Sequence, residues 1–115
     1  MIGCDIIETK RIKSAYTKLG ESFSDRVLSE REKELFIQKK RSMDFLSGRF
    51  AAKEAVSKCL KTGLGKLGLK NIEILAGENG EPVVYLNGNT TDLEVSISHS
   101  KNMAMAVAIK NRGEK

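Results

Sequence analysis

Two side chains, one acidic and one basic, form the clearest chemical pattern in this sequence. Glu54 and Lys58 lie four residues apart in the segment Gly48-Arg-Phe-Ala-Ala-Lys-Glu-Ala-Val-Ser-Lys58, which its apolar spacing predicts to be helical. That separation also suits a surface ion pair worth about 0.2–0.5 kcal/mol, so the helix alone leaves a structural role open. Phe50 beside Glu54 favours the other interpretation, in which a ligand, a metal or another subunit covers this face.

The predicted helix has two sides at about 100° per residue. One side is apolar and should face the core: Phe45, Ala52, Ala55, Val56 and Cys59. The other side is expected to lie open and to carry the chemistry: Ser47, Phe50, Glu54, Ser57, Lys58 and Lys61.

Asp5 is a second carboxylate in an unexpected place, between apolar neighbours in the first predicted strand. A carboxylate is rarely buried unless it is paired or binds a metal, although an Asp that accepts backbone hydrogen bonds at a strand end is the alternative. Mg²⁺ takes one or two protein carboxylates and fills its other positions with water and phosphate oxygens. Asp5 and Glu54 therefore make a candidate Mg²⁺ pair if the first strand packs on the long helix.

A third polar group follows a predicted strand in Val95-Ser-Ile-Ser-His-Ser100. Ser98, His99 and Ser100 precede Lys101, and hydroxyl, imidazole and ammonium groups together can hold a phosphate. A histidine with a purely structural hydrogen bond is the alternative. A hydrolase triad is weakly supported because His99 has no evident nucleophile partner. The glycine-rich stretch 61–68 lacks the spacing of a Walker loop and follows a helix instead of leading into one.

Composition limits the class of protein. The chain has 115 residues, a formal charge of +5 and 40% hydrophobic residues, which fits one folded domain with an acidic partner. Cys4 and Cys59 fit neither a disulfide framework nor a zinc spacing, and both suit small buried positions. No stretch reaches the ~20 apolar residues of a membrane span. A reduced, cytoplasmic protein is the simplest expectation.

The elements that must position these residues can be read from hydrophobic periodicity. Ile2, Cys4 and Ile6 alternate, which predicts a first strand over 1–7 with these side chains buried. Thr9 is predicted to cap a basic helix, and Ser29 with Glu32 forms a capping-box pattern. Helices are expected over 9–19, 29–39 and 42–60, and strands over 71–75, 82–87, 93–98 and 102–110, the last buried on both faces. We therefore expect an α+β fold in a single domain, 1–115.

Four motifs in this order resemble the bacterial holo-(acyl-carrier-protein) synthases, the short 4′-phosphopantetheinyl transferases. They are Gly3-Cys4-Asp5, the helical segment from Gly48 to Lys58, Asn79-Gly-Glu-Pro82 and Ser96-Ile-Ser-His99. The resemblance extends from the first strand to about Ile109. Cys4 departs from it, since the family usually has an aliphatic residue there.

The resemblance implies a reaction in fatty acid biosynthesis. The 4′-phosphopantetheine arm of coenzyme A would move to a serine of apo-acyl carrier protein, with release of adenosine 3′,5′-bisphosphate. Asp5 and Glu54 would hold Mg²⁺, and Lys58 would reach the pyrophosphate. The base for the serine hydroxyl stays open between a water on the metal and one of the two carboxylates.

The same resemblance implies the remaining contacts. Arg11 is the best-supported contact with the carrier protein, on a helix that also carries Lys10, Lys13 and Lys18. A homotrimer with sites between its subunits is expected, which would cover the open helix face. Candidate contacts with the coenzyme phosphates are Lys40, Arg41, Arg49, Ser98, His99 and Ser100.

Two other classes fit the charge. A small basic nucleic-acid-binding module is permitted by composition, but the sequence lacks the aromatic platforms and the loop motifs of single-strand readers. Such a module also gives no role to Asp5 or Glu54. A domain that binds carrier protein without chemistry is the other alternative, and transfer of the coenzyme arm separates the three.

Overall fold

The computed structural model describes residues 1–60 and 68–111. The predictions made for Lys61, for the rest of the glycine-rich stretch up to residue 67 and for the tail 112–115 lie outside these residues. The α+β class is confirmed. In chain order the elements are β1 (Ile2–Glu8), α1 (Thr9–Leu19), α2 (Glu21–Val27), α3 (Glu30–Gln38), α4 (Met43–Leu60), the short 3₁₀ helix η1 (Leu69–Asn71), β2 (Ile72–Ala76), β3 (Pro82–Leu86), β4 (Asn89–Thr90), β5 (Leu93–His99) and β6 (Met103–Lys110).

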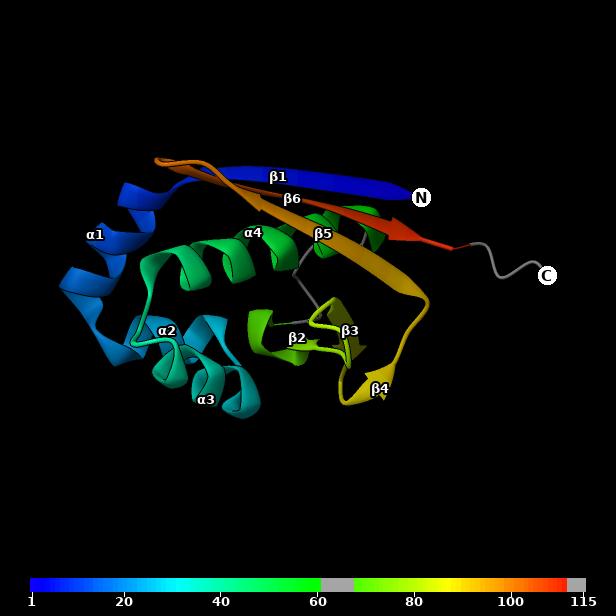
Figure 1. Ribbon diagram of the computed structural model, residues 1–115, viewed down its shortest axis with the longest axis horizontal. Helices are drawn as coiled ribbons and strands as arrows, with labels where there is room; N and C mark the ends of the chain where they lie inside the picture. The colour runs from blue at the N-terminus through cyan, green and yellow to red at the C-terminus, as the bar shows by residue number, and fades with distance from the viewer. Residues whose placement is uncertain (61–67, 112–115) are drawn as a thin grey trace.

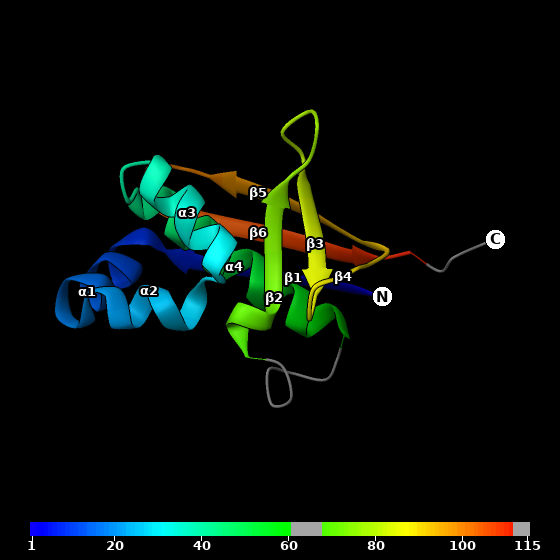
Figure 2. The same ribbon diagram turned by 90° about the horizontal axis from the view of Figure 1, so that it is seen from below.

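Helix α4 lies at the centre of the molecule, between two antiparallel sheets (Figure 1). The first sheet has the order β1-β6-β5, and the second has the order β2-β3-β4. Figure 2 shows the β2–β3 hairpin crossing the helix on the side opposite the first sheet, with α3 beside it. The first strand and the last one are neighbours, since Ile2 pairs with Ile109.

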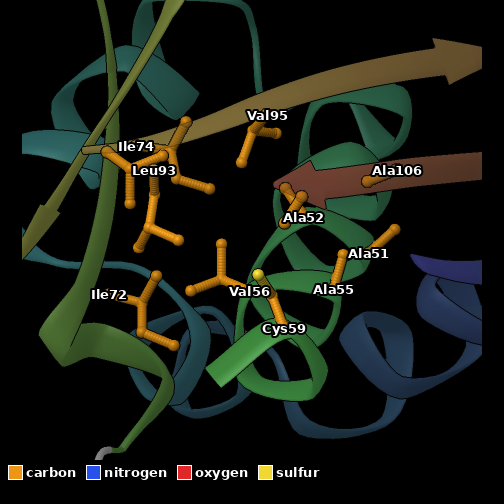
Figure 3. Packing of buried hydrophobic residues seen from close by; sticks show 12 residues of the cluster. Ala51, Ala52, Ala55, Val56, Cys59, Ile72, Ile74, Leu93, Val95 and Ala106 are labelled. Atoms are coloured by element: carbon orange, nitrogen blue, oxygen red, sulfur yellow. The ribbon is translucent and has the colours of Figure 1, made fainter. Parts of the chain in front are cut away.

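Small residues let α4 pack closely against both sheets. Ala51 and Ala55 lie toward β6, while Val56 lies toward Ile72 of β2 (Figure 3). A second cluster joins α1, α2 and α3 to the first turns of α4 around Phe36. The predicted apolar side of α4 is confirmed, because all five of its residues are buried: Phe45, Ala52, Ala55, Val56 and Cys59.

The helix ends agree only in part with the sequence patterns. The capping box is confirmed, since the Ser29 hydroxyl accepts from the Glu32 amide and the Glu32 carboxylate accepts from the Ser29 amide. The prediction for Thr9 is wrong: it is the first helical residue, and no side chain caps α1. Gly20 ends α1 with φ of 62°, as expected. Helix α2 was not predicted.

The buried face of β1 is the reverse of the predicted one. Ile2 and Ile6 are 65% and 61% exposed, and Cys4 is exposed too. The neighbours on the other face, Gly3 and Asp5, turn toward α4 instead. Alternation correctly separates two faces of a strand, but among residues 1–60 and 68–111 nothing packs on the apolar face of β1.

Two further burial predictions need correction. Ser47 and Ser57 of α4 were expected on the open side, yet both are buried because elements cover the helix on nearly every side. Strand β6 was expected to be buried on both faces. Its three alanines are buried, whereas Met105 and Ile109 are 40% and 44% exposed. In residues 1–60 and 68–111, no helix has the length and apolar content needed to span a membrane.

Candidate active site

A close approach between β1 and α4 places Asp5 beside the helix. A Cβ atom on Gly3 would lie only 2.2 Å from the Ala55 carbonyl oxygen and 2.5 Å from the Cys59 amide nitrogen. Only a residue without a side chain allows backbones to come this near. Asp5, two residues along the strand, points to the same side.

Asp5, Glu54 and Lys58 come together at this contact, as the sequence predicted. The Lys58 ammonium donates to Asp5 Oδ1 at 3.0 Å and to the Cys4 carbonyl oxygen at 3.1 Å. Partial burial raises the pKa of Glu54, and the negative charge of Asp5 raises it further, while Lys58 opposes both. The hydrogen bond from Lys58 to Asp5 raises the pKa of that lysine. Two carboxylates therefore share one region with the Lys58 ammonium.

This donor set fits Mg²⁺ better than a metal that needs many protein ligands. Among the residues that the structure describes, no group of three or more His, Cys, Asp or Glu side chains could hold a metal. Mg²⁺ needs only one or two carboxylates when water and phosphate oxygens complete its shell. The raised pKa of Glu54 indicates a site where added positive charge would be stabilising.

His99 lies at a different place, near the beginning of α4. Its Nε2 is 2.8 Å from the Asp44 carbonyl oxygen. Gly48 makes room for the ring, because a Cβ atom there would lie 2.8 Å from Nε2. Ser98 and Ser100 are exposed beside it, and together with His99 they line a hollow of about 280 Å³ that also borders Ile6, Met103 and Met105.

Lys40 and Arg41 join α3 to α4 in an unusual backbone conformation. Their φ angles are 59° and 55°, in the left-handed region that residues other than glycine rarely adopt. Both residues are exposed, and the Arg41 guanidinium donates to Glu21 at 3.2 Å. Their amides bond to the Ile37 and Phe36 carbonyl oxygens, so this conformation closes the last turn of α3, and the phosphate-binding role of the pair stays a prediction.

Arg49 is held on the other side of α4, toward β2. Its Nε donates to the Ile74 carbonyl oxygen at 3.0 Å, and its guanidinium lies 4.5 Å from the centre of the Phe45 ring. Burial lowers the pKa of Arg49, although the nearby Glu32 carboxylate opposes this. Its contacts are therefore with the second sheet, and its coenzyme role stays a prediction.

The predicted site residues thus form two groups within one chain. Asp5 is on β1 and His99 is on β5. Because β6 lies between these two strands, the strands are about 10 Å apart. Along α4, Gly48 and Glu54 are about 9 Å apart. The chain does not bring the carboxylate pair and the Ser98–Ser100 group into one contact. A long ligand, or a second copy of the chain, is needed to join them.

Arg11 lies on a third surface, formed by α1. Arg11, Lys10, Lys13 and Lys18 are all exposed along this helix. A hollow of about 490 Å³ at its first turn is lined by Lys10, Lys13 and Lys101 together with Glu8, Thr9 and Asn102. This surface is basic, as an acidic partner would require.

Sequence reasoning also missed the buried lysine of α4. Lys53, the neighbour of Glu54, has no exposed surface and forms an ion pair with the buried Glu32. The available signal was its position, because Lys53 lies three residues before Val56 and four after Arg49 on the side of the helix that faces β2. A lysine there needs a buried acidic partner, and Glu32 is that partner.

Comparison with known proteins decides the family. The family model described as the 4′-phosphopantetheinyl transferase superfamily matches residues 1–110. The chain belongs to this superfamily. The holo-(acyl-carrier-protein) synthase of a Geobacillus species is 46% identical over 114 residues, covering 96% of this chain and 95% of that protein. The enzyme of the same name from Enterococcus faecalis is also 46% identical, over 107 residues, covering 91% of each chain.

Solved structures of the superfamily share the fold. The holo-(acyl-carrier-protein) synthase of Helicobacter pylori in complex with coenzyme A has a TM-score of 0.86 and 32% identity, covering 96% of this chain and 100% of that one. The Bacillus anthracis synthase, in complex with CoA (3′,5′-ADP), has a TM-score of 0.80 and 38% identity, covering 93% and 91%. The family resemblance seen in the sequence motifs is confirmed.

Proposed function

We propose that this transferase is a holo-(acyl-carrier-protein) synthase. It transfers the 4′-phosphopantetheine group of coenzyme A to a serine of apo-acyl carrier protein. The observation that carries the proposal is the 46% identity to a synthase of that name over nearly the whole of both chains. The cluster of Asp5, Glu54 and Lys58 supports it, because phosphoryl transfer needs positioned charge around the pyrophosphate.

In this reaction the serine oxygen forms a bond to the phosphorus of the phosphopantetheine group. The bond from that phosphorus to the bridging pyrophosphate oxygen breaks, adenosine 3′,5′-bisphosphate leaves with the electron pair, and one proton is released. Lys58 would lie against the departing phosphate. Asp5 and Glu54 would hold Mg²⁺, which supplies positive charge against the pyrophosphate.

The remaining coenzyme phosphates would bind cationic and hydroxyl groups at the start of α4. Lys40 and Arg41 are exposed there in their left-handed conformation, and His99 is fixed against Gly48. Ser98 and Ser100 would add hydroxyl donors. Arg49 would bind a coenzyme phosphate through its terminal guanidinium nitrogens, because its Nε already donates to Ile74.

A homotrimer would join the two groups of site residues and cover the apolar face of the first sheet. We call this the outer sheet face, and its exposed side chains are Ile2, Cys4, Ile6, Met105 and Ile109, with the half-buried Val107 among them. Large apolar patches of this kind mark interaction surfaces. Closed threefold symmetry would let each chain give its carboxylate pair to one site and its Ser98–Ser100 group to the next.

The carrier protein would dock on α1. Carrier proteins of this class are acidic, and the four exposed cations of this helix complement them. Arg11 is the proposed central contact, because it lies next to β1, whose motif matches the family well. A cytoplasmic location stays a prediction, and so does a reduced state for Cys4 and Cys59.

Mass spectrometry of the carrier protein tests the proposed function directly. Incubation of apo-acyl carrier protein with coenzyme A, Mg²⁺ and this transferase should add the mass of one phosphopantetheine group. Apo-carrier with its acceptor serine changed to alanine is the control and should not gain mass. Unchanged carrier from several bacteria, with folded transferase, would overturn the assignment.

A further inference from the structure

Lys53 is a lysine with every donor engaged inside the protein. Its ammonium donates to the Val27 carbonyl oxygen, to Glu32 Oε1 and to the Leu69 carbonyl oxygen, the last at 3.0 Å. An ammonium has three N–H groups, so none is left over. Because the side chain has no exposed surface, these bonds join α4 to the end of α2, to α3 and to η1.

Glu32 extends the same network to the second sheet. Its Oε2 accepts from the Ile74 amide at 2.7 Å, and its Oε1 also accepts from the Ser29 amide. Strand β2 is an edge strand, with β3 on one side only. Glu32 and Arg49 engage the amide and the carbonyl of Ile74 in place of a neighbouring strand. Figure 2 shows how α3, α4 and β2 lie together around this point.

The network restrains the rotation of α4 about its axis. Arg49 and Lys53 are four residues apart and lie on one side of the helix, and both are bonded to elements outside it. Glu54 is the next residue, about 100° further around. A small rotation of α4 would therefore swing Glu54 away from Asp5. On the other side of the helix, Gly3 sets the close approach to β1, and Lys58 reaches Asp5 and the Cys4 carbonyl oxygen only in this orientation of α4.

Stability alone does not require a buried ion pair here. Apolar side chains of similar volume often replace such a pair with no loss of stability, whereas removal of one partner alone is strongly destabilising. We propose that the Glu32–Lys53 ion pair is a positioning device, which fixes the rotation of α4 so that Glu54 and Lys58 face Asp5. This inference rests on the proposed function, and it makes Glu32 and Lys53 positioning residues of the transfer.

The test replaces both partners together. The double variant Glu32→Leu/Lys53→Met removes both charges and should keep its circular dichroism spectrum and unfold cooperatively. Its kcat should fall about 10- to 100-fold, since a misplacement of about 1 Å can cost that much. The Mg²⁺ concentration for half-maximal rate should rise, and the KM for carrier protein should stay unchanged because α1 is untouched. If the pair were merely structural, the Mg²⁺ concentration for half-maximal rate would not change.

A matched control uses a different ion pair, Arg31–Glu73, which joins α3 to β2. Arg31 donates to Glu73 at 2.9 Å, but neither residue bonds to α4. Arg31→Gln/Glu73→Gln should therefore leave kcat and the Mg²⁺ requirement unchanged. If Glu32→Leu/Lys53→Met does not fold, Glu32→Gln, which keeps the shape, decides the question: a folded variant with lowered kcat supports the proposal, and one with wild-type kcat overturns it.

Calorimetric titration with Mn²⁺ separates this proposal from the proposed function. If the wild type transfers no phosphopantetheine but binds Mn²⁺, weaker Mn²⁺ binding by the double variant would still support a positioning role. Equal Mn²⁺ affinity and equal kcat in a folded double variant would overturn it. A wild-type protein that neither transfers the group nor binds Mn²⁺ would overturn both proposals.

Discussion

The carboxylates of Asp5 and Glu54 repel each other as long as no cation lies between them. The pKa of Glu54 is raised by burial first and by Asp5 second. A carboxyl group whose pKa is higher in the folded state takes up protons on folding, so its contribution to stability falls as the pH rises from its ordinary value through the raised one. At neutral pH without metal, this pair therefore costs stability that Mg²⁺ would restore.

Asp5→Asn and Glu54→Gln should each lower the transfer rate by about 100-fold or more, because each removes a charged ligand but keeps its shape. In EDTA, Glu54→Gln should unfold at a higher temperature than the wild type, since folding then neither buries a charge at this position nor brings it against Asp5. Added Mg²⁺ should raise the unfolding temperature of the wild type more than that of either variant. Wild-type rates with an unchanged Mg²⁺ requirement would make the pair structural.

At the scale of elements, the contact between β1 and α4 depends on one glycine. Gly3→Ala would put a Cβ atom 2.2 Å from the Ala55 carbonyl oxygen, which cannot move without the helix. We expect a loss of about 1–3 kcal/mol in unfolding free energy and a further drop in transfer rate as Asp5 moves from Glu54. Gly68→Ala is the control, because its nearest neighbour would be 3.9 Å away. Denaturant unfolding of both variants measures the difference.

The secondary structure elements show how much of the fold could be predicted from the sequence. Alternation identified β1 but not its buried face, since the inward position of Gly3 and Asp5 depends on the packing of α4. The same holds for Ser47 and Ser57, which are buried because other elements surround α4. Helix α2 escaped notice because its seven residues are too few to show a clear apolar period.

The sequence singled out Asp5 and Glu54 because acidic residues in apolar surroundings are rare, and their role as a metal pair stays a prediction. The separation of Asp5 from His99 was not foreseen, since the order β1-β6-β5 arises from pairing between the two ends of the chain. Lys53 was missed because adjacent Lys and Glu residues in a helix are typical of an exposed surface. Only the position of Glu32 in the fold shows that Lys53 has a buried partner.

For the whole molecule, the basic surface of α1 should govern association with the carrier. Arg11→Glu should weaken carrier binding by roughly 1–3 kcal/mol and leave coenzyme binding nearly unchanged. Rising salt should weaken the wild-type complex, because exposed charges are screened over about 8 Å at physiological ionic strength. Lys70→Glu makes the same charge change on η1 and is the control. A salt-independent affinity together with an unaffected Arg11→Glu variant would place docking elsewhere.

The outer sheet face should govern assembly. Ile6 is 61% exposed and pairs across the sheet with Met105, so Ile6→Lys would place a charge within the proposed subunit contact. Sedimentation should then find single chains where the wild type forms trimers. Ile37→Lys, at an exposed position on α3, should leave the wild-type assembly intact. A monomeric wild type would refute the trimer and leave the outer sheet face without its proposed cover.

The way in which β2 is bonded along its open edge has a consequence for solubility. Unpaired edge strands recruit strands of other chains and so promote aggregation. The amide and the carbonyl of Ile74 are already engaged by Glu32 and Arg49, so a foreign strand would have to displace two charged side chains before it could pair there. The residues that orient the helix thus also protect the sheet, and a chain that loses them becomes prone to self-association while its core is still intact.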